Sequence, residues 1–170
     1  MTDPDPVATE PLLTDATPTS WSDACRQLSA GDTYWLATVH PDGRPQLRPV
    51  LAVWLDGTLH FCASPTSRKA ENLALDSRSV LATSSDAADL VVEGKAVKVD
   101  DAAALRRVGE AYADKYGWDV EVRDGALHGD GAPTAGPPPY EVYALMPSTV
   151  FGFGADESFS PTRWSFEPAR

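Results

Sequence analysis

The sequence predicts an α+β protein in which an antiparallel β-barrel carries helices packed on its outside. Short β-rich stretches follow one another in hairpin order, tight turns join them, and helical patterns are inserted between groups of strands. A doubly wound parallel sheet would instead place a helix after each strand. The 170 residues, of which 42% are hydrophobic, are sufficient for one domain with a substantial core.

The N-terminal part divides into a lead-in and the start of the domain. Residues 1–19 are rich in Pro, Thr and Asp and are predicted to be disordered or extended, so the single domain spans 20–170. Ser20 is predicted to cap a short amphipathic helix that ends before Gly31. Three strands are then expected to form an antiparallel meander, at 33–40, 46–55 and 58–63.

The second and third of these strands meet at Asp56-Gly57, a strong hairpin signal. Strand 46–55 has apolar residues on both faces, which predicts that both faces are covered. The turn formers at 64–67 follow the hairpin, and Ser67 is positioned as the N-cap of a helix that runs to Leu75.

The rest of the chain contains more strands, one longer helix and one long loop. Gly94 lies inside a strand and indicates a bulge or a close backbone approach. Residues 117–139 show little regular pattern and predict a lid, a binding loop or disorder. The expected strands are 78–85, 89–99, 140–146, 149–153 and 162–166, and the helix runs from Asp100 or Asp101 to about Tyr116.

Two adjacent cations, Arg68 and Lys69, fall in the first turn of the helix that follows Ser67. A helix N-terminus already carries positive partial charge, so cations there are unfavourable for the helix itself. The hydroxyls of Ser64, Thr66 and Ser67 lie beside them in the sequence, and such a combination binds anions. The interpretation that we favour is a phosphate site; the alternative is a solvated Arg–Lys pair.

The net charge of −11 makes a nucleic-acid or anionic-membrane partner unfavourable. Two scattered cysteines favour a reducing compartment, so we expect a cytoplasmic protein, and no apolar run approaches the length of a membrane span. His40, His60 and His128 show no metal-ligand spacing. We therefore expect no metal site, and we expect these histidines to be structural or exposed rather than catalytic.

Four motifs together resemble a known family. They are Arg48-Pro49-Val50, the run from Phe61 to Lys69 that ends in Ser-Arg-Lys, Val92-Glu93-Gly94, and the closing Thr162-Arg163-Trp164-Ser165-Phe166. On these residues the chain resembles the pyridoxamine 5'-phosphate oxidase-like split-barrel flavoproteins. The resemblance covers roughly 34–99, with 162–166 as a second anchor.

The resemblance implies a homodimeric split β-barrel of six to seven strands in Greek-key order, with a flavin or deazaflavin in a cleft between the subunits. Arg48 and Lys69 would hold the cofactor's phosphate, with Ser67 and Arg68 beside them. Trp164 would approach the ring from the partner chain. The residues whose backbone would line the ring and ribityl chain are Pro49, Val50, Phe61, Cys62, Ala63 and Ser64.

The chain also departs from the family pattern. Val53 replaces a lysine, Asp89-Leu90-Val91 replaces Arg-Gln-Val, and Ala63 replaces the threonine of the phosphate loop. We therefore expect that the protein is not a true pyridoxamine phosphate oxidase. The closing Thr-Arg-Trp-x-Phe resembles instead a branch that includes users of the deazaflavin coenzyme F-420.

These observations predict an oxidoreductase that uses FMN or coenzyme F-420 to transfer hydride to or from a small conjugated substrate. In such proteins the cofactor carries the chemistry and the chain binds, orients and shields it, so we expect no catalytic side chain. One alternative is a non-catalytic carrier of flavin, haem or a tetrapyrrole, with His60 or His128 as candidate axial ligands. Another is a dimeric interaction protein with a vestigial site.

Overall fold

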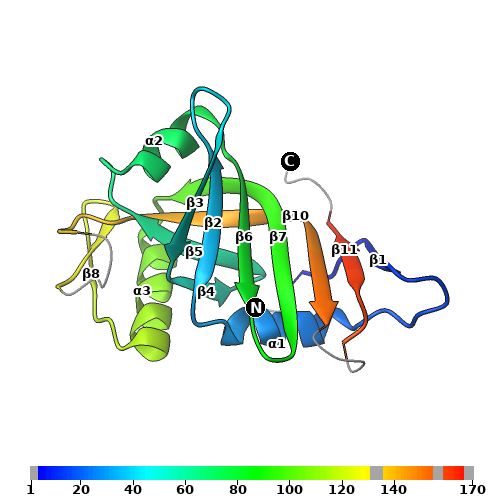
Figure 1. Cartoon of the computed structure of the whole chain (residues 1–170). Coiled ribbons are helices and arrows are strands. Elements are labelled where there is room, and N and C mark those ends of the chain that lie inside the picture. The colour runs from blue at the N-terminus through cyan, green and yellow to red at the C-terminus, as the bar shows by residue number, and fades with distance from the viewer. Residues whose placement is uncertain (1–3, 131–135, 155–158, 167–170) are drawn as a thin grey trace.

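The computed structural model of the chain describes residues 4–130, 136–154 and 159–166 and confirms the α+β class (Figure 1). This part of the chain contains one antiparallel sheet of nine strands and a separate two-stranded sheet. Its helices are α1 (Trp21–Ala30), α2 (Arg68–Leu75) and α3 (Ala102–Tyr116). Its strands are β1 (Ala8–Pro11), β2 (Tyr34–Val39), β3 (Pro45–Val50), β4 (Ala52–Leu55), β5 (Thr58–Ala63), β6 (Arg78–Ser84), β7 (Ala88–Val99), β8 (Glu121–Arg123), β9 (Ala126–His128), β10 (Glu141–Gly154) and β11 (Thr162–Ser165).

Seven strands form the barrel wall, in the order β3–β2–β6–β7–β10–β5–β4. All of their pairings are antiparallel, and several join strands that are distant in sequence. Within the described residues β3 pairs with β2 alone and β4 with β5 alone, so no strand ladder closes the wall. The barrel is therefore split, as the resemblance implied.

The predicted strand 46–55 is the element that the structure corrects most clearly. The chain turns at Leu51, so that β3 pairs with β2 while β4 pairs with β5. The backbone at this corner bonds to α3 instead of to a strand: Tyr112 Oη donates to the Leu51 carbonyl oxygen at 2.9 Å, and Tyr116 Oη to that of Ala52 at 2.8 Å. The apolar residues of β4 alternate between two different cores, so both faces of this strand are covered, as predicted.

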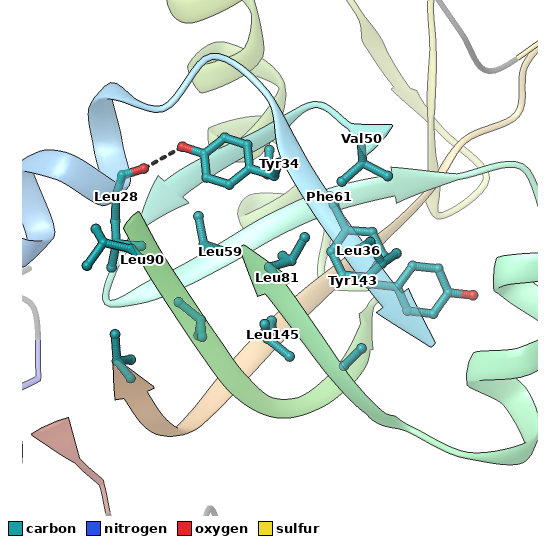
Figure 2. Packing of buried hydrophobic residues seen from close by; sticks show 14 of the residues in the cluster. Leu28, Tyr34, Leu36, Val50, Leu59, Phe61, Leu81, Leu90, Tyr143 and Leu145 are labelled. Carbon is teal, nitrogen blue, oxygen red and sulfur yellow. Dashed lines mark hydrogen bonds between the residues drawn. The ribbon is translucent and has the colours of Figure 1, made fainter. Parts of the chain in front are cut away.

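The barrel interior holds the larger core, which Figure 2 shows from close by. Its fully buried members come from many strands and include Tyr34, Leu36, Leu59, Phe61 and Leu81. A second core lies between α3 and the opposite face of β4 and β5, and contains Val53, Leu105, Val108 and Tyr112.

The 140–146 and 149–153 stretches form one strand, β10, rather than the predicted two. Its ladder with β7 extends over its whole length, with an irregularity between Pro147 and Thr149. On its other side β10 pairs first with β5 and then with β11. A Cβ at Gly94 would overlap the carbonyl oxygen of Met146, which confirms the close backbone approach predicted for that glycine.

The N-terminal lead-in contains a strand that the sequence analysis did not anticipate. Residues 8–11 form β1, which pairs with β11, and the Pro4 carbonyl oxygen accepts a hydrogen bond from Trp21 Nε1 at 3.0 Å. The segment 117–139 also contains regular structure, because β8 and β9 form a hairpin there. Residues 131–135 of that predicted loop lie outside the described residues.

The predicted helix starts are confirmed in detail. The side chains of Ser20, Ser67 and Asp101 each accept a hydrogen bond from a backbone N–H in the first turn of α1, α2 and α3. Within the described ranges, no helix combines the length and apolarity that a membrane crossing requires.

The buried His60 predicts a pH dependence of stability. Its side chain is 7% exposed, and burial lowers the pKa of its imidazole. Below about pH 6.5 the unfolded chain therefore binds the proton more readily than the folded chain does. We expect the free energy of unfolding to fall between pH 7 and pH 5, with a His60 contribution of at most about 1.4 kcal/mol per pH unit. Urea unfolding of wild type and His60→Gln measures this, and identical pH slopes for the two proteins would contradict it.

Candidate functional site

The candidate site lies at the opening between β3 and β5. Phe61 is the last residue of β5 that pairs with β4, opposite Ala52. Beyond it, Cys62 and Ala63 pair with β10 on one side alone among the described residues. The free edge of β3 and the free edge at the end of β5 therefore both present unpaired backbone groups, which is where a planar ligand can receive backbone hydrogen bonds.

The residues predicted to line a cofactor ring through their backbone lie on these two edges. They are Pro49 and Val50 on β3, and Phe61 to Ser64 on β5 and just after it. The side chains of Val50, Phe61 and Ala63 are buried in the barrel core, and Phe61 stacks on Tyr143 at a centroid distance of 5.5 Å. Figure 2 shows Val50 and Phe61 in the same part of that core. Val50, Phe61 and Ala63 can thus offer backbone groups, but not side chains, to a ligand at the opening.

The helix α2 connects the two edges of the opening. At its N-terminal end, Lys69 lies near enough to Cys62 of β5 for each group to influence the pKa of the other. One turn further on, Asn72 Nδ2 donates to Thr38 Oγ1 of β2 at 3.0 Å and to Gln46 Oε1 of β3 at 3.2 Å. Asn72 was not among the predicted site residues, although the sequence carries a signal for it: a polar residue on the apolar face of an amphipathic helix.

The two cations of the Ser-Arg-Lys motif, Arg68 and Lys69, lie in different environments. Arg68 is exposed and forms an ion pair with Glu71 at 2.6 Å, which fits the solvated alternative. Lys69 is half-buried, and its ammonium group has neither an acidic partner nor a hydrogen-bond acceptor among the described residues. Burial lowers the pKa of Lys69, whereas the nearby Cys62 acts in the opposite direction. A partly desolvated ammonium without a counter-ion is stabilised by any anion that reaches it.

The hydroxyl groups before α2 are already ordered. Ser67 N donates to the Ser64 carbonyl oxygen at 2.9 Å, and Ser67 Oγ accepts from Ala70 N at 3.4 Å. Ser64 Oγ and Thr66 Oγ1 lie 3.2 Å apart. Because Ser67 Oγ acts as an acceptor for the helix, its own proton stays free to be donated to an anion. We call Arg48, Ser64, Ser67, Arg68 and Lys69 the anion site.

Arg48 lies on the other edge of the opening, on β3. It is exposed, lies opposite Leu36 in the β2–β3 ladder, and its Nη1 donates to the carbonyl oxygen of Leu47 at 2.8 Å. It has no acidic partner in the part of the chain that the structure describes.

Burial raises the pKa of Cys62 to about 12, so this thiol stays neutral beside Lys69.

The structure corrects one contact that the resemblance implied. Trp164 is 0% exposed and packs against Trp21 and Phe159 at centroid distances of 5.7 and 6.3 Å. The single chain encloses the ring completely, so Trp164 has no surface to present to a cofactor bound by another copy. His60 is likewise buried, which removes it as an axial ligand for haem at the opening.

The described part of the chain is a split antiparallel barrel with the anion site at its open strand edges. The sequence profile of the pyridoxamine 5'-phosphate oxidase family matches residues 22–153. The chain therefore belongs to this family. No curated protein sequence matches the chain.

Solved structures with the same fold include proteins that bind different cofactors. A haem-binding protein from Mycobacterium smegmatis is 20% identical, with a TM-score of 0.63 over 84% of this chain and 57% of its own. An FAD-binding protein from the same organism is 15% identical, with a TM-score of 0.58; the match covers 82% of this chain and 100% of that protein. A NimC/NimA family protein from Clostridium acetobutylicum is 15% identical, with a TM-score of 0.59; the match covers 85% of this chain and 91% of that protein. The chain thus spans little more than half of the haem-binding protein, and at these identities the likeness concerns the fold.

The different states of Lys69 and Arg68 predict different effects of their removal. Lys69→Ala is expected to weaken binding of a phosphate-bearing flavin by ~2 kcal/mol, about thirtyfold in dissociation constant, because a charge-assisted contact is lost. Arg68→Ala serves as the matched control and is expected to change the constant less, because Glu71 already neutralises that guanidinium. Fluorescence titration measures both, and an unchanged constant for Lys69→Ala would exclude the anion site.

Proposed function

We propose that the protein binds a phosphate-bearing flavin-type cofactor, FMN or the deazaflavin coenzyme F-420, at the opening between β3 and β5. The observation that carries this proposal is the half-buried ammonium of Lys69, which has no acidic partner within the described ranges. Three ordered hydroxyl-bearing residues, Ser64, Thr66 and Ser67, precede Lys69 in the chain. A phosphate dianion supplies the missing charge, and the free strand edges supply backbone donors and acceptors for a planar ring.

The reaction that we propose is hydride transfer to or from a small conjugated substrate. When bound, a flavin or deazaflavin ring supplies the hydride chemistry. The chain's own contribution is binding and orientation: Lys69 and Arg48 neutralise the phosphate from two sides, and the edges of β3 and β5 align the ring. The buried side chains beneath these edges, such as Val50 and Phe61, exclude water from one face of the ring.

The replaced family residues support a substrate other than a vitamin B6 phosphate. Val53, where the oxidase carries a lysine, is 2% exposed and packs in the core under α3. It therefore contributes neither charge nor a hydrogen bond at the opening. The second candidate is a non-catalytic carrier of flavin, haem or a tetrapyrrole, which is favoured by the shared fold of the haem-binding protein from Mycobacterium smegmatis.

Parallel titrations with FMN, coenzyme F-420 and haem, followed by quenching of tryptophan fluorescence, test the proposal. We expect micromolar binding of FMN or F-420, followed by oxidation and reduction of the bound cofactor by small conjugated compounds. Tight binding without turnover would favour the carrier, and selective binding of haem would contradict a flavin-type cofactor. Failure of all three ligands to bind would exclude both functions.

We further propose that the protein is a homodimer whose subunits meet through the outer face of the sheet. A row of apolar residues crosses five neighbouring strands there in direct register: Pro49, Trp35, Ala82, Val91 and Phe151. Trp35 is 47% exposed in the single chain, and the nearby Leu47 is 53% exposed. An apolar row of this kind is typical of a protein–protein contact. Because β3 carries both Pro49 of this row and Arg48 of the anion site, a second copy on this face would adjoin the opening.

A charged residue introduced into this apolar row is expected to dissociate the proposed dimer. We expect Trp35→Glu to convert a dimer into a monomer and to weaken cofactor binding, because a buried unpaired carboxylate is costly at an interface. Leu13→Glu, on the exposed N-terminal segment, is the matched control and should remain dimeric. Sedimentation velocity measures both, and a monomeric wild type at micromolar concentration would overturn the proposed dimer.

A further inference from the structure

Asn72 is a fully buried amide in the middle of α2. Its side chain is 0% exposed, and Nδ2 donates both to Thr38 Oγ1 at 3.0 Å and to Gln46 Oε1 at 3.2 Å. Thr38 and Gln46 are direct cross-strand partners in the β2–β3 ladder. One amide group therefore fixes the helix to both strands of this hairpin at a single register position.

The residues that flank this contact belong to the anion site. Lys69 precedes Asn72 by three residues, which places both side chains on neighbouring positions of one helix face. Arg48 follows Gln46 by two residues, so both side chains leave β3 on the same side. The contact between Asn72 and Gln46 thus lies beside the position where Lys69 and Arg48 would converge on one phosphate. A slip of the helix along the hairpin would separate the two cations.

An amide at this position is unfavourable for the stability of the fold. Asn72 Oδ1 is buried and has no hydrogen-bond partner in the described part of the chain. Asparagine is also a poor residue for a helix interior. An apolar residue such as leucine would fill the position without an unsatisfied polar atom, but it would impose no directional restraint between α2 and β3.

We propose that Asn72 is a positioning residue of the anion site: through Thr38 and Gln46 it holds Lys69 of α2 in register with Arg48 of β3, and so sets the selectivity for a phosphorylated cofactor. This inference rests on the proposed binding of a phosphate-bearing flavin at the opening. Asn72 itself need not touch the cofactor, because its effect passes through the placement of the two cations.

The test compares ligands that differ by the phosphate alone. Affinities for FMN and riboflavin, or for F-420 and its phosphate-free deazaflavin alcohol, are measured for wild type, Asn72→Leu and Gln46→Met. Gln46 is only partly buried, so Gln46→Met removes the acceptor while retaining the length of the side chain and keeps the test open if Asn72→Leu does not fold. Thr83→Val is the control, because Thr83 is equally a buried polar residue, but its hydroxyl donates to the Thr33 carbonyl oxygen, away from α2.

We expect Asn72→Leu and Gln46→Met to bind the phosphorylated ligand about tenfold more weakly and the phosphate-free ligand unchanged, whereas Thr83→Val keeps the wild-type ratio. Equal losses for both ligands, unchanged ratios, or an altered ratio in Thr83→Val would overturn the positioning role and leave the proposed function intact. A wild type that binds neither ligand, or does not prefer the phosphorylated one, would overturn the phosphate-bearing cofactor and this inference together.

Discussion

The corner at Leu51 is the feature on which the split barrel depends. A chain that leaves one strand partner for another exposes backbone groups that must be satisfied elsewhere. Here three side chains of α3 provide the partners: Tyr112 and Tyr116 donate to the carbonyl oxygens of Leu51 and Ala52, and Lys115 Nζ donates to Ala52 at 3.2 Å. Burial lowers the pKa of Lys115 to about 8, and its ammonium also lies 5.2 Å from the centre of the Tyr116 ring. Because these bonds replace a strand ladder, β3 and β5 can stay apart, and the opening between them is a direct result.

The anion site acts locally against an acidic protein. The net charge is −11, yet carboxylates close to the site in sequence are paired with arginines, Glu71 with Arg68 and Asp76 with Arg78. Exposed charges further away are screened over about 8 Å at physiological ionic strength. Lys69, which is half-buried, is screened less. An anion at the opening therefore meets the field of Lys69 more strongly than the field of the whole surface.

Local signals in the sequence predicted most of the elements. The caps at Ser20 and Ser67, the Asp56-Gly57 hairpin and the close approach at Gly94 each depend on the chemistry of a few neighbouring residues. The corner at Leu51 could not be predicted in this way, because its hydrogen-bond partners are about 60 residues away in α3. The unpaired state of Lys69 and the burial of Trp164 have the same origin, since tertiary packing decides both.

Strand β10 has a consequence for how the chain reaches its native state. It pairs with β7 along its whole length and also with β5, whose residues precede it by about 80 positions. Pairings over such separations are slow to form, because the entropy of a long loop is lost before any contact is gained. During synthesis the edges of β5 and β7 stay uncovered until residues 141–154 have left the ribosome. The wall of the barrel is therefore completed late, and until then its uncovered strand edges are open to pairing with other chains.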